Sequence, residues 1–298
     1  MRKLQAGQAL KQAELSGIDL TGMHLDKGVF VEAYLRRAKL NKATCQGADF
    51  SGATLIMASF QAANLKNAQL VDAVLTLAHL EQANLEKVNG KGAKLSSAVL
   101  TAATAENALF DEADFREASG VGLSFDHVSG VGTTFNRVTF KECRFEKGQL
   151  ARSQWQAATV TNSSFIAADL ERTFWENATL TGTDFSQANG LKSDFKQADL
   201  TAATLCQTQL DWATLVKATL VKANCQAASF FNTDLTGANL SQADFTKADL
   251  REASLEEAQV SEACFEGANV RGALFTDAVG LSDVQRDWLK KNGALNVE

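Results

Sequence analysis

Large apolar residues recur at every fifth position along almost the whole chain. From Leu10 to Phe275 the repeat runs through 54 consecutive pentads without an insertion or deletion, and 42 of these core positions hold Leu or Phe. A second signal lies two residues earlier, where Ala occupies 36 of the 54 positions. A register kept over this length predicts one repetitive structure rather than a set of separate helices and strands.

A period of five suits neither regular secondary structure. On an α-helix of about 3.6 residues per turn, a step of five rotates the side chain by about 140°, so no single face becomes apolar. A long flat strand requires a period of two. The pattern instead predicts a short extended stretch, in which Ala and the large residue point to the same side, followed by a corner. Because one pentad cannot bury its apolar residue alone, repetition predicts a solenoid with Leu and Phe inside.

The segment 243–252, which reads ADFTKADLRE, shows two complete units. The repeat resembles the pentapeptide-repeat family, and the resemblance extends from residue 8 to about residue 280. It implies an all-β fold: a right-handed quadrilateral parallel β-helix of twenty residues per coil, or about 13.5 coils. The sequence adds weak support at period twenty, because one of the four sides, from Leu15 to Phe275, has no small residue at its core position.

The chain divides into three predicted segments. Residues 1–9 are expected to form an N-terminal cap, residues 10–280 the β-helix, and residues 281–298 a capping helix with a tail. Within the β-helix the centre at residues 119–157 is atypical. Ala is missing from the position two residues before each core residue, and the core positions themselves are rich in Phe and Gly. This centre indicates either a bend or a join between two arrays.

The predicted C-terminal helix has both a start signal and an apolar face. Ser282 fits the N-cap, and Gln285 three residues later completes a capping box. Val284, Trp288 and Leu289 share one face of such a helix. This face is suited to sealing the last coil, and the same helix is also a candidate homodimer contact at the C-terminal end.

Composition and charge narrow the function classes. The formal net charge is −6, which disfavours direct binding to nucleic acid. None of the 298 residues is Pro, as expected if every backbone N–H is needed in a continuous ladder. The start has no apolar run of signal-peptide length, and no stretch is long enough to span a membrane. The expectation is a cytoplasmic protein with no membrane partner.

The sequence offers no catalytic, cofactor or metal site, so we do not expect an enzyme. The three His are widely separated, and the five Cys form neither a CxxC motif nor a cluster with His. Cys45 and Cys225 fall at core positions and are expected to be buried thiols, whereas Cys206 is expected to point outward. Asp and Asn before the core residue, such as Asp199 and Asn239, are expected to hydrogen-bond the corner backbone.

Three sets of outward-facing residues are candidate interaction surfaces. The first, the Trp212 cluster, consists of Leu191, Trp212 and Phe231. The second, the Met57 group, consists of Ile56, Met57, Val74 and Leu77. The third, the acidic column, consists of Glu86, Glu106, Asp126 and Glu146, spaced twenty apart. Like charges on adjacent strands repel, so the column is either balanced by neighbouring bases or is a docking strip for a basic partner.

Three functions remain open at this point. The repeat predicts a non-catalytic rigid scaffold for binding a protein partner or a second copy of itself, since a surface fixed before binding loses little entropy on binding. The family resemblance implies a second role, a DNA-mimicking modulator of DNA gyrase or a related topoisomerase, as in quinolone resistance. It also implies a third, an accessory or effector protein of a bacterial secretion system.

Overall fold

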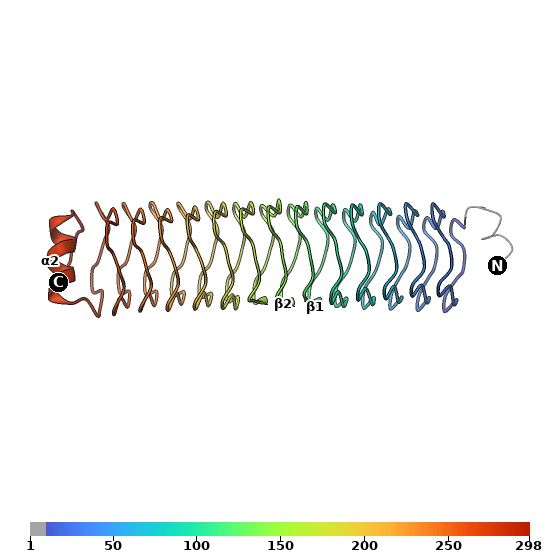
Figure 1. The fold of residues 1–298 in the computed structure, drawn as a ribbon, viewed down its shortest axis with the longest axis horizontal. Helices are drawn as coiled ribbons and strands as arrows, with labels where there is room; N and C mark the ends of the chain where they lie inside the picture. The colour runs from blue at the N-terminus through green and yellow to red at the C-terminus, as the bar shows by residue number, and fades with distance from the viewer. Residues whose placement is uncertain (1–9) are drawn as a thin grey trace. The chain divides into compact units, whose positions relative to one another are not determined.

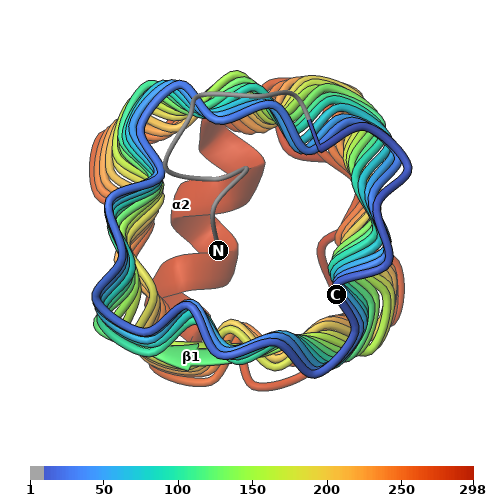
Figure 2. The same cartoon turned by 90° about the vertical axis from the view of Figure 1, so that its right-hand side faces the viewer.

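The structure is a computed structural model that describes residues 10–298. The predicted N-terminal cap at residues 1–9 lies outside the described residues. The chain forms two compact units, Met1–Ser153, described from residue 10, and Gln154–Glu298. In each unit successive coils stack side by side (Figure 1), and seen end-on they trace a four-sided outline (Figure 2).

Parallel bridges hold the coils of each unit together. They join residues twenty positions apart, for example Lys39 with Ser59 in the first unit and Asp199 with Thr219 in the second. Twenty residues are four pentads, one for each side of the outline. The chain is therefore a parallel β-helix, as the repeat predicts.

Three of the five backbone N–H groups in each pentad bond to a neighbouring coil. Around the core residue Leu40, the N–H of Leu40 donates to the Ser59 carbonyl at 2.7 Å and that of Lys42 to the Gln61 carbonyl at 2.8 Å. The N–H of the residue before the core position donates in the opposite direction, to the coil that precedes it. Pro has no N–H to donate, so this use of the main chain explains why the sequence contains no Pro.

A fourth N–H closes most of the corners in a tight turn. The N–H of Ala43 donates to the carbonyl of Leu40 at 3.1 Å, and Lys42 between them has a φ of 57°. A positive φ at this place is the signature of a type II turn. Gly22 takes the same position with a φ of 67°. Side chains other than glycine are strained here by about 1–3 kcal/mol each, so the ladder and the core must offset that strain.

The fifth N–H explains the Asp and Asn residues of the repeat. The Oδ1 atom of Asp199 accepts a hydrogen bond from the Thr201 N–H at 2.9 Å, and Oδ1 of Asn239 accepts one from the Ser241 N–H at 3.1 Å. Both bonds span two residues and lie at a corner. The corner role predicted for these side chains is confirmed.

The interior follows the five-residue pattern closely. From residue 33 to residue 275 both the core position and the position two residues before it are buried. Each fully buried Leu or Phe side chain stabilises the fold by about 1.5–3 kcal/mol relative to exposure. Where the core residue is Gly, a neighbour takes the space: a Cβ atom on Gly90 would lie 2.4 Å from Cε1 of Phe110.

Short strands occur near the middle of the sequence. Within residues 10–298 these are β1 (Ser119–Val121) and β2 (Thr139–Lys141) in the first unit and β3 (Thr159–Thr161) in the second. β1 pairs with β2 in parallel. Two residues after each strand the usual Ala is replaced, by Leu123, Cys143 and Ser163. A larger inward side chain thus follows each of these strands.

The only helix in the described part of the chain is α2 (Asp283–Lys291). Ser282 Oγ accepts a hydrogen bond from the Gln285 N–H at 3.3 Å, and Gln285 Oε1 accepts one from the Ser282 N–H at 2.9 Å. The predicted capping box is confirmed. An acidic residue in the first turn and basic residues in the last complement the helix dipole.

After α2 the chain rejoins the ladder. Leu295 forms a parallel bridge with Leu274, and the Gly293 carbonyl accepts a hydrogen bond from the Gly272 N–H at 2.8 Å. The spacing between the bridged residues is one residue longer than inside the coils. The tail therefore adds one more edge to the second unit, and α2 occupies the place of the remaining sides.

No helix within residues 10–298 combines the length and the apolar character needed to cross a membrane.

Candidate interaction surfaces

The Trp212 cluster contains an exposed aromatic pair on the second unit. Trp212 is 53% exposed, and its ring meets that of Phe231 edge-on with the centroids 5.8 Å apart. The two residues lie on neighbouring coils, because the Trp212 N–H donates to the Phe231 carbonyl at 3.0 Å. Leu191 lies half-buried on the preceding coil. The structure therefore brings Trp212 and Phe231 into contact and places Leu191 beside them.

Arg251 extends this cluster on the next coil. Its guanidinium carbon lies 5.4 Å from the Phe231 ring centroid, within the range of a cation–π contact. Asp249 holds the guanidinium in place, with Nε 2.8 Å from Oδ1 and Nη2 2.6 Å from Oδ2. The hydrogen bond from Arg251 lowers the pKa of Asp249, so the pair stays charged at neutral pH. Trp212, Phe231 and Arg251 are residue types that dominate the energy of protein interfaces.

The Met57 group is a weaker apolar patch on the first unit. Only Leu77 is exposed, at 42%, while Ile56, Met57 and Val74 are half-buried. Met57 and Leu77 occupy the turn position of adjacent coils, with φ of 57° and 60°. The group lies on adjacent coils, since the N–H groups of residues 55 and 57 donate to the carbonyls of residues 74 and 76, and little of its apolar area is open to a partner.

Basic side chains pair with the acidic column of the first unit. Lys66 Nζ lies 2.6 Å from Glu86 Oε2, and Lys87 Nζ lies 3.4 Å from Glu86 Oε1. The Lys66 hydrogen bond lowers the pKa of Glu86. Arg144 Nη2 lies 3.7 Å from Glu106 Oε1. Of the two interpretations of the column, the geometry favours charges balanced by neighbours over a bare acidic strip.

Asp126 is a correction to the predicted column. It is only 8% exposed, because its two oxygens serve the molecule itself. Oδ2 lies 2.5 Å from Arg144 Nη2, and Oδ1 accepts a hydrogen bond from the Glu146 N–H at 3.0 Å. The side chain closes a contact between coils and is not available to a partner.

The C-terminal helix covers the last coil with part of its predicted face. Leu289 is buried and Trp288 is half-buried. Val284 is 79% exposed, so the prediction that Val284 helps to seal the last coil is wrong. The reason lies in Gln285, whose Nε2 donates to the Ala263 carbonyl at 2.7 Å. Consecutive helix residues point about 100° apart, so turning Gln285 to the coil turns Val284 to solvent.

An apolar groove remains between α2 and the coil below it. It measures about 210 Å³ and is lined by Phe265, Glu266, Val284, Gln285 and Trp288. Figures 1 and 2 show α2 lying across the end of the last coil of its unit. The groove is the part of this end that is open to a partner.

The cysteine side chains lie where the repeat predicts them. Cys45 and Cys225 are buried and Cys206 is partly exposed, as predicted. Burial raises the pKa of the Cys45 thiol to about 12, so it is protonated and inert at neutral pH. Across residues 10–298 no group of three or more His, Cys, Asp or Glu side chains is placed to hold a metal ion.

The repeat geometry agrees with a match to a family model. The model for pentapeptide repeats matches in eight copies, over residues 29–67, 55–92, 93–129, 161–189, 193–224, 223–258 and 238–277. The chain belongs to the pentapeptide-repeat family. No curated protein has a sequence that matches it.

Several solved pentapeptide-repeat structures are similar to this one. HetL from the cyanobacterium Nostoc, involved in regulating heterocyst differentiation, is 23% identical over 94% of this chain and 97% of its own, with a TM-score of 0.35. QnrB1, a plasmid-mediated fluoroquinolone resistance protein, is 15% identical over 58% of this chain and 95% of its own, also with a TM-score of 0.35. A thylakoid-lumen protein of Arabidopsis thaliana is 36% identical over 34% of this chain and 78% of its own, with a TM-score of 0.20. At these TM-scores we draw no functional argument from the likeness.

Two functional details of this pentapeptide-repeat protein were not evident from its sequence. Arg251 stands two residues after Asp249, a spacing that could have suggested their pairing, but its contact with Phe231 depends on the stacking of coils. Arg144 reaches Asp126 across 18 residues, a diagonal between adjacent coils that a search at multiples of twenty does not find.

Proposed function

We propose that this pentapeptide-repeat protein is a non-catalytic scaffold that binds a protein partner, or a second copy of itself, through the Trp212 cluster. The observation that carries the proposal is the exposed Trp212 ring, fixed against Phe231 by a ring contact and by the backbone ladder. A surface already ordered in the free protein loses little conformational entropy on binding. Trp and Arg are also the side chains most often found at interface hot spots.

The interior supports a structural rather than a catalytic role. Ser and Thr hydroxyls that face inward are bound to main-chain carbonyls, as from Thr233 Oγ1 to the Leu210 carbonyl at 2.7 Å. The buried Cys45 thiol is held protonated. We infer that the protein is not an enzyme and needs no cofactor.

The test compares Trp212→Glu with Gln207→Glu. Both residues occupy the exposed turn position with positive φ, at 62° and 58°, so both variants keep the fold and add one negative charge. Sedimentation velocity measures self-association, and cross-linking in cells followed by mass spectrometry identifies a partner. A hot-spot residue is worth about 2 kcal/mol or more, so Trp212→Glu should weaken the association about thirtyfold or more and Gln207→Glu should not. Equal association by both variants would remove the proposal.

The second candidate function is that of a DNA mimic that acts on DNA gyrase. A mimic of this kind requires an extended negative field. In the acidic column, Lys66, Lys87 and Arg144 lie against the carboxylates, so the column does not supply such a field. A supercoiling assay with and without a quinolone decides the matter: inhibition or protection by the purified protein would revive this function. No observation favours the secretion role over the scaffold.

Further features of the scaffold are inferred from the family. We infer right-handed winding, about 13.5 coils and an atypical segment at residues 119–157. We also infer that a homodimer contact, if the protein self-associates, uses the groove beside Val284 and Trp288. Val284→Glu would then reduce the mass measured by sedimentation. A cytoplasmic location stays a prediction.

A further inference from the structure

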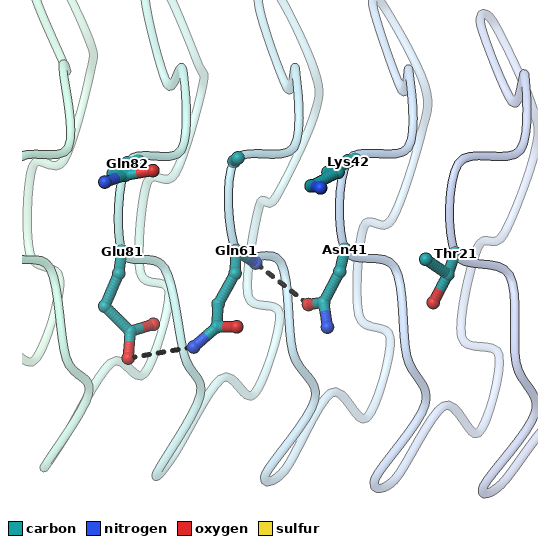
Figure 3. A pocket seen from close by; sticks show the side chains of 7 residues that line it. Thr21, Asn41, Lys42, Gln61, Glu81 and Gln82 are labelled. Atoms are coloured by element: carbon teal, nitrogen blue, oxygen red, sulfur yellow. Dashed lines mark hydrogen bonds between the residues drawn. The ribbon is translucent and has the colours of Figure 1, made fainter.

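A polar groove of about 490 Å³ runs along the first unit and belongs to none of the surfaces described above. Figure 3 shows its lining in two rows that cross successive coils. One row contains Thr21, Asn41, Gln61 and Glu81, each twenty residues after the last. The other row contains Lys42, Ala62 and Gln82.

A short side chain at the turn position produces the hollow. Lys42, Ala62 and Gln82 all occupy that position, with φ of 57°, 54° and 58°. Ala62 lies between two long side chains and leaves the space above its coil open. Gly22, one coil before Lys42, has nothing within 4 Å of where its Cβ would be. The groove is therefore a consequence of side-chain length on an otherwise regular surface.

The groove carries a cation at one place and an anion two coils further along. Within residues 10–298 the Lys42 ammonium makes no ion pair. Glu81 Oε1 is 3.3 Å from Gln61 Nε2 and 3.2 Å from His79 Nδ1. Its other oxygen, Oε2, is buried and has no hydrogen-bond partner in the described part of the chain. The Glu81 side chain as a whole is 26% exposed. A ligand that fits must therefore offer an acceptor near Lys42 and a donor that meets the Glu81 carboxylate from its exposed side.

Two carboxamides lie between the charges. Asn41 Oδ1 accepts from the Gln61 N–H at 3.1 Å and from Ser59 Oγ, which directs the Nδ2 donors of Asn41 away from the coil. Gln61 Nε2 donates to Glu81, which leaves Gln61 Oε1 as a possible acceptor. A carboxamide has the same donor and acceptor as a peptide bond. This pair is therefore matched to the backbone of another polypeptide.

The spacing of the charges selects a conformation. Lys42 and Glu81 are two coils apart, which is about 9.6 Å at the usual strand separation of about 4.8 Å. In a polyproline II helix, three residues per turn at about 3.1 Å each place residues i and i+3 on one side about 9.3 Å apart. In an extended strand the nearest residues on one side, i and i+2, are only about 6.8 Å apart. Polyproline II also has no internal hydrogen bonds, so its backbone is free to bond Asn41 and Gln61.

We propose that this groove binds a segment of another protein in the polyproline II conformation, with an acidic residue and a basic residue three positions apart. The acid lies against Lys42 and Asn41, and the base lies against Glu81. The site is on the first unit and the Trp212 cluster is on the second, so each proposal stands or fails separately.

The test uses two peptides of identical composition. The first is acetyl-Pro-Pro-Asp-Pro-Pro-Lys-Pro-Pro-amide, with the charges at i and i+3. The second is acetyl-Pro-Pro-Asp-Pro-Lys-Pro-Pro-Pro-amide, with the charges at i and i+2. In a titration followed by heteronuclear NMR, the first peptide should shift the side-chain amide signals of Asn41 and Gln61 with a Kd of about 1 mM. The second, which can form only one of the two ion pairs, should bind about fivefold more weakly.

Variants locate the binding in the groove. Ala62→Gln fills the hollow and should abolish the shifts, whereas Ala202→Gln, at an exposed turn position of the second unit with a φ of 55°, should leave them unchanged. Glu81→Gln should remove the preference for the first peptide, and Trp212→Glu should have no effect. The proposal is overturned if the two peptides bind equally to the unmodified protein, if Ala62→Gln binds normally, or if no saturable shift occurs up to about 20 mM peptide.

Discussion

Two sets of coils share the same kind of backbone ladder but enclose different interiors. They lie between residues 33 and 118 in the first unit and between residues 163 and 233 in the second. In the first set, the inward position beside the core is Ala in every pentad except that of Val88. In the second set, a hydroxyl replaces Ala at about every second or third pentad, at Ser163, Thr173, Thr183, Ser193, Thr208 and Thr233. Buried polar groups are costly unless they are hydrogen-bonded, so the second interior has to meet a condition that the first does not.

The second unit meets this condition by bonding its hydroxyls to the main chain. Thr183 Oγ1 donates to the Val160 carbonyl at 2.9 Å, and Thr208 Oγ1 donates to the Phe185 carbonyl at 2.8 Å. Thr173 also accepts a hydrogen bond from the indole N–H of Trp175 at 2.8 Å. The ladder therefore does not depend on an apolar lining. A Ser or Thr whose hydroxyl reaches a main-chain carbonyl can replace the inward Ala, and the Thr173 hydroxyl also provides an acceptor for the indole N–H of a core Trp.

The largest effect is expected when the aromatic core of the second unit is removed. Trp175 is buried and stacks on Trp155 with the centroids 4.7 Å apart. Trp175→Ala should lower the free energy of unfolding by about 3–5 kcal/mol, because it leaves a cavity and also removes the indole hydrogen bond to Thr173, whose hydroxyl keeps its bond to the Leu170 carbonyl at 2.8 Å. Leu75→Ala, on the same side of the first unit, leaves a smaller cavity and removes no hydrogen bond. Urea denaturation followed by circular dichroism measures both; a smaller loss for Trp175→Ala than for Leu75→Ala would contradict the comparison.

A second prediction isolates the hydroxyl. Thr173→Val keeps the shape of the side chain but leaves the Trp175 indole N–H without its acceptor, which should cost about 1–3 kcal/mol. Thr233→Val removes only a donor to the Leu210 carbonyl, which still accepts the Ala213 N–H at 3.0 Å, and should cost about 1 kcal/mol. The same denaturation experiment ranks the two variants. Equal losses would mean that the Trp175 bond contributes nothing of its own.

A third prediction concerns the end of the second unit, where a side chain again donates a hydrogen bond to a main-chain carbonyl. Gln285→Glu keeps the oxygen that caps α2 but loses the Nε2 donor to the Ala263 carbonyl, at a cost of about 1–2 kcal/mol. Gln285→Ala loses the cap as well and should be less stable than Gln285→Glu. Hydrogen exchange of the α2 amides reports the change locally. If Gln285→Glu exchanges like the unmodified protein, the contact with Ala263 does not hold the helix in place.

The smallest effect concerns a charge pair that occurs once in each unit. Asp114 pairs with Arg116 at 2.6 Å, as Asp249 pairs with Arg251 at 2.6 Å. Burial raises the pKa of Asp114, but its hydrogen bonds with Arg116 outweigh that, and the pKa of each carboxyl is lowered. A lowered pKa in the folded state stabilises the protein above the ordinary Asp value of about 3.9. That stability is lost as the pH falls through the lowered pKa.

Arg116→Met and Arg251→Met should therefore be less stable than the unmodified protein at pH 7. The Arg116→Met deficit should vanish once Asp114 is protonated, whereas Arg251→Met should keep the part that comes from the lost contact with Phe231. Arg251→Met should show the larger change, because it also removes the cation from Phe231. Thermal unfolding midpoints between about pH 2 and pH 7 provide the measurement. A difference that persists unchanged into acid would show that the ion pair is not its cause.

The features predictable from the sequence are those that repeat locally. The fivefold spacing indicates which residues face inward, and Asp or Asn before a core residue indicates the corner bond, since both depend on neighbours within a few positions. The capping box of α2 is predictable for the same reason. Leu77 and Trp212 are also placed outward by register alone.

The unpredicted features depend on contacts between coils. Asp126 is spaced like its column neighbours, yet it is buried because Arg144 lies diagonally across from it. Val284 fits an apolar helix face, yet it is exposed because Gln285 turns toward Ala263. The polar groove arises from the length of Lys42 and Gln82 relative to Ala62. The repeat pattern shows which residues face outward, but it does not show which side chains of adjacent coils touch.

Residue-resolved amide hydrogen exchange of the free protein most directly tests the claim that the coils hold a binding surface ready-made. The N–H of Trp212 is bonded to the Phe231 carbonyl at 3.0 Å, and that of Leu210 to the Ser229 carbonyl at 2.8 Å. We expect both amides to exchange slowly without any partner, at rates like those of the core positions around them. If the Trp212 amide exchanges at the rate of an unfolded chain while Leu210 is protected, the surface is not preorganised and does not form before a partner binds.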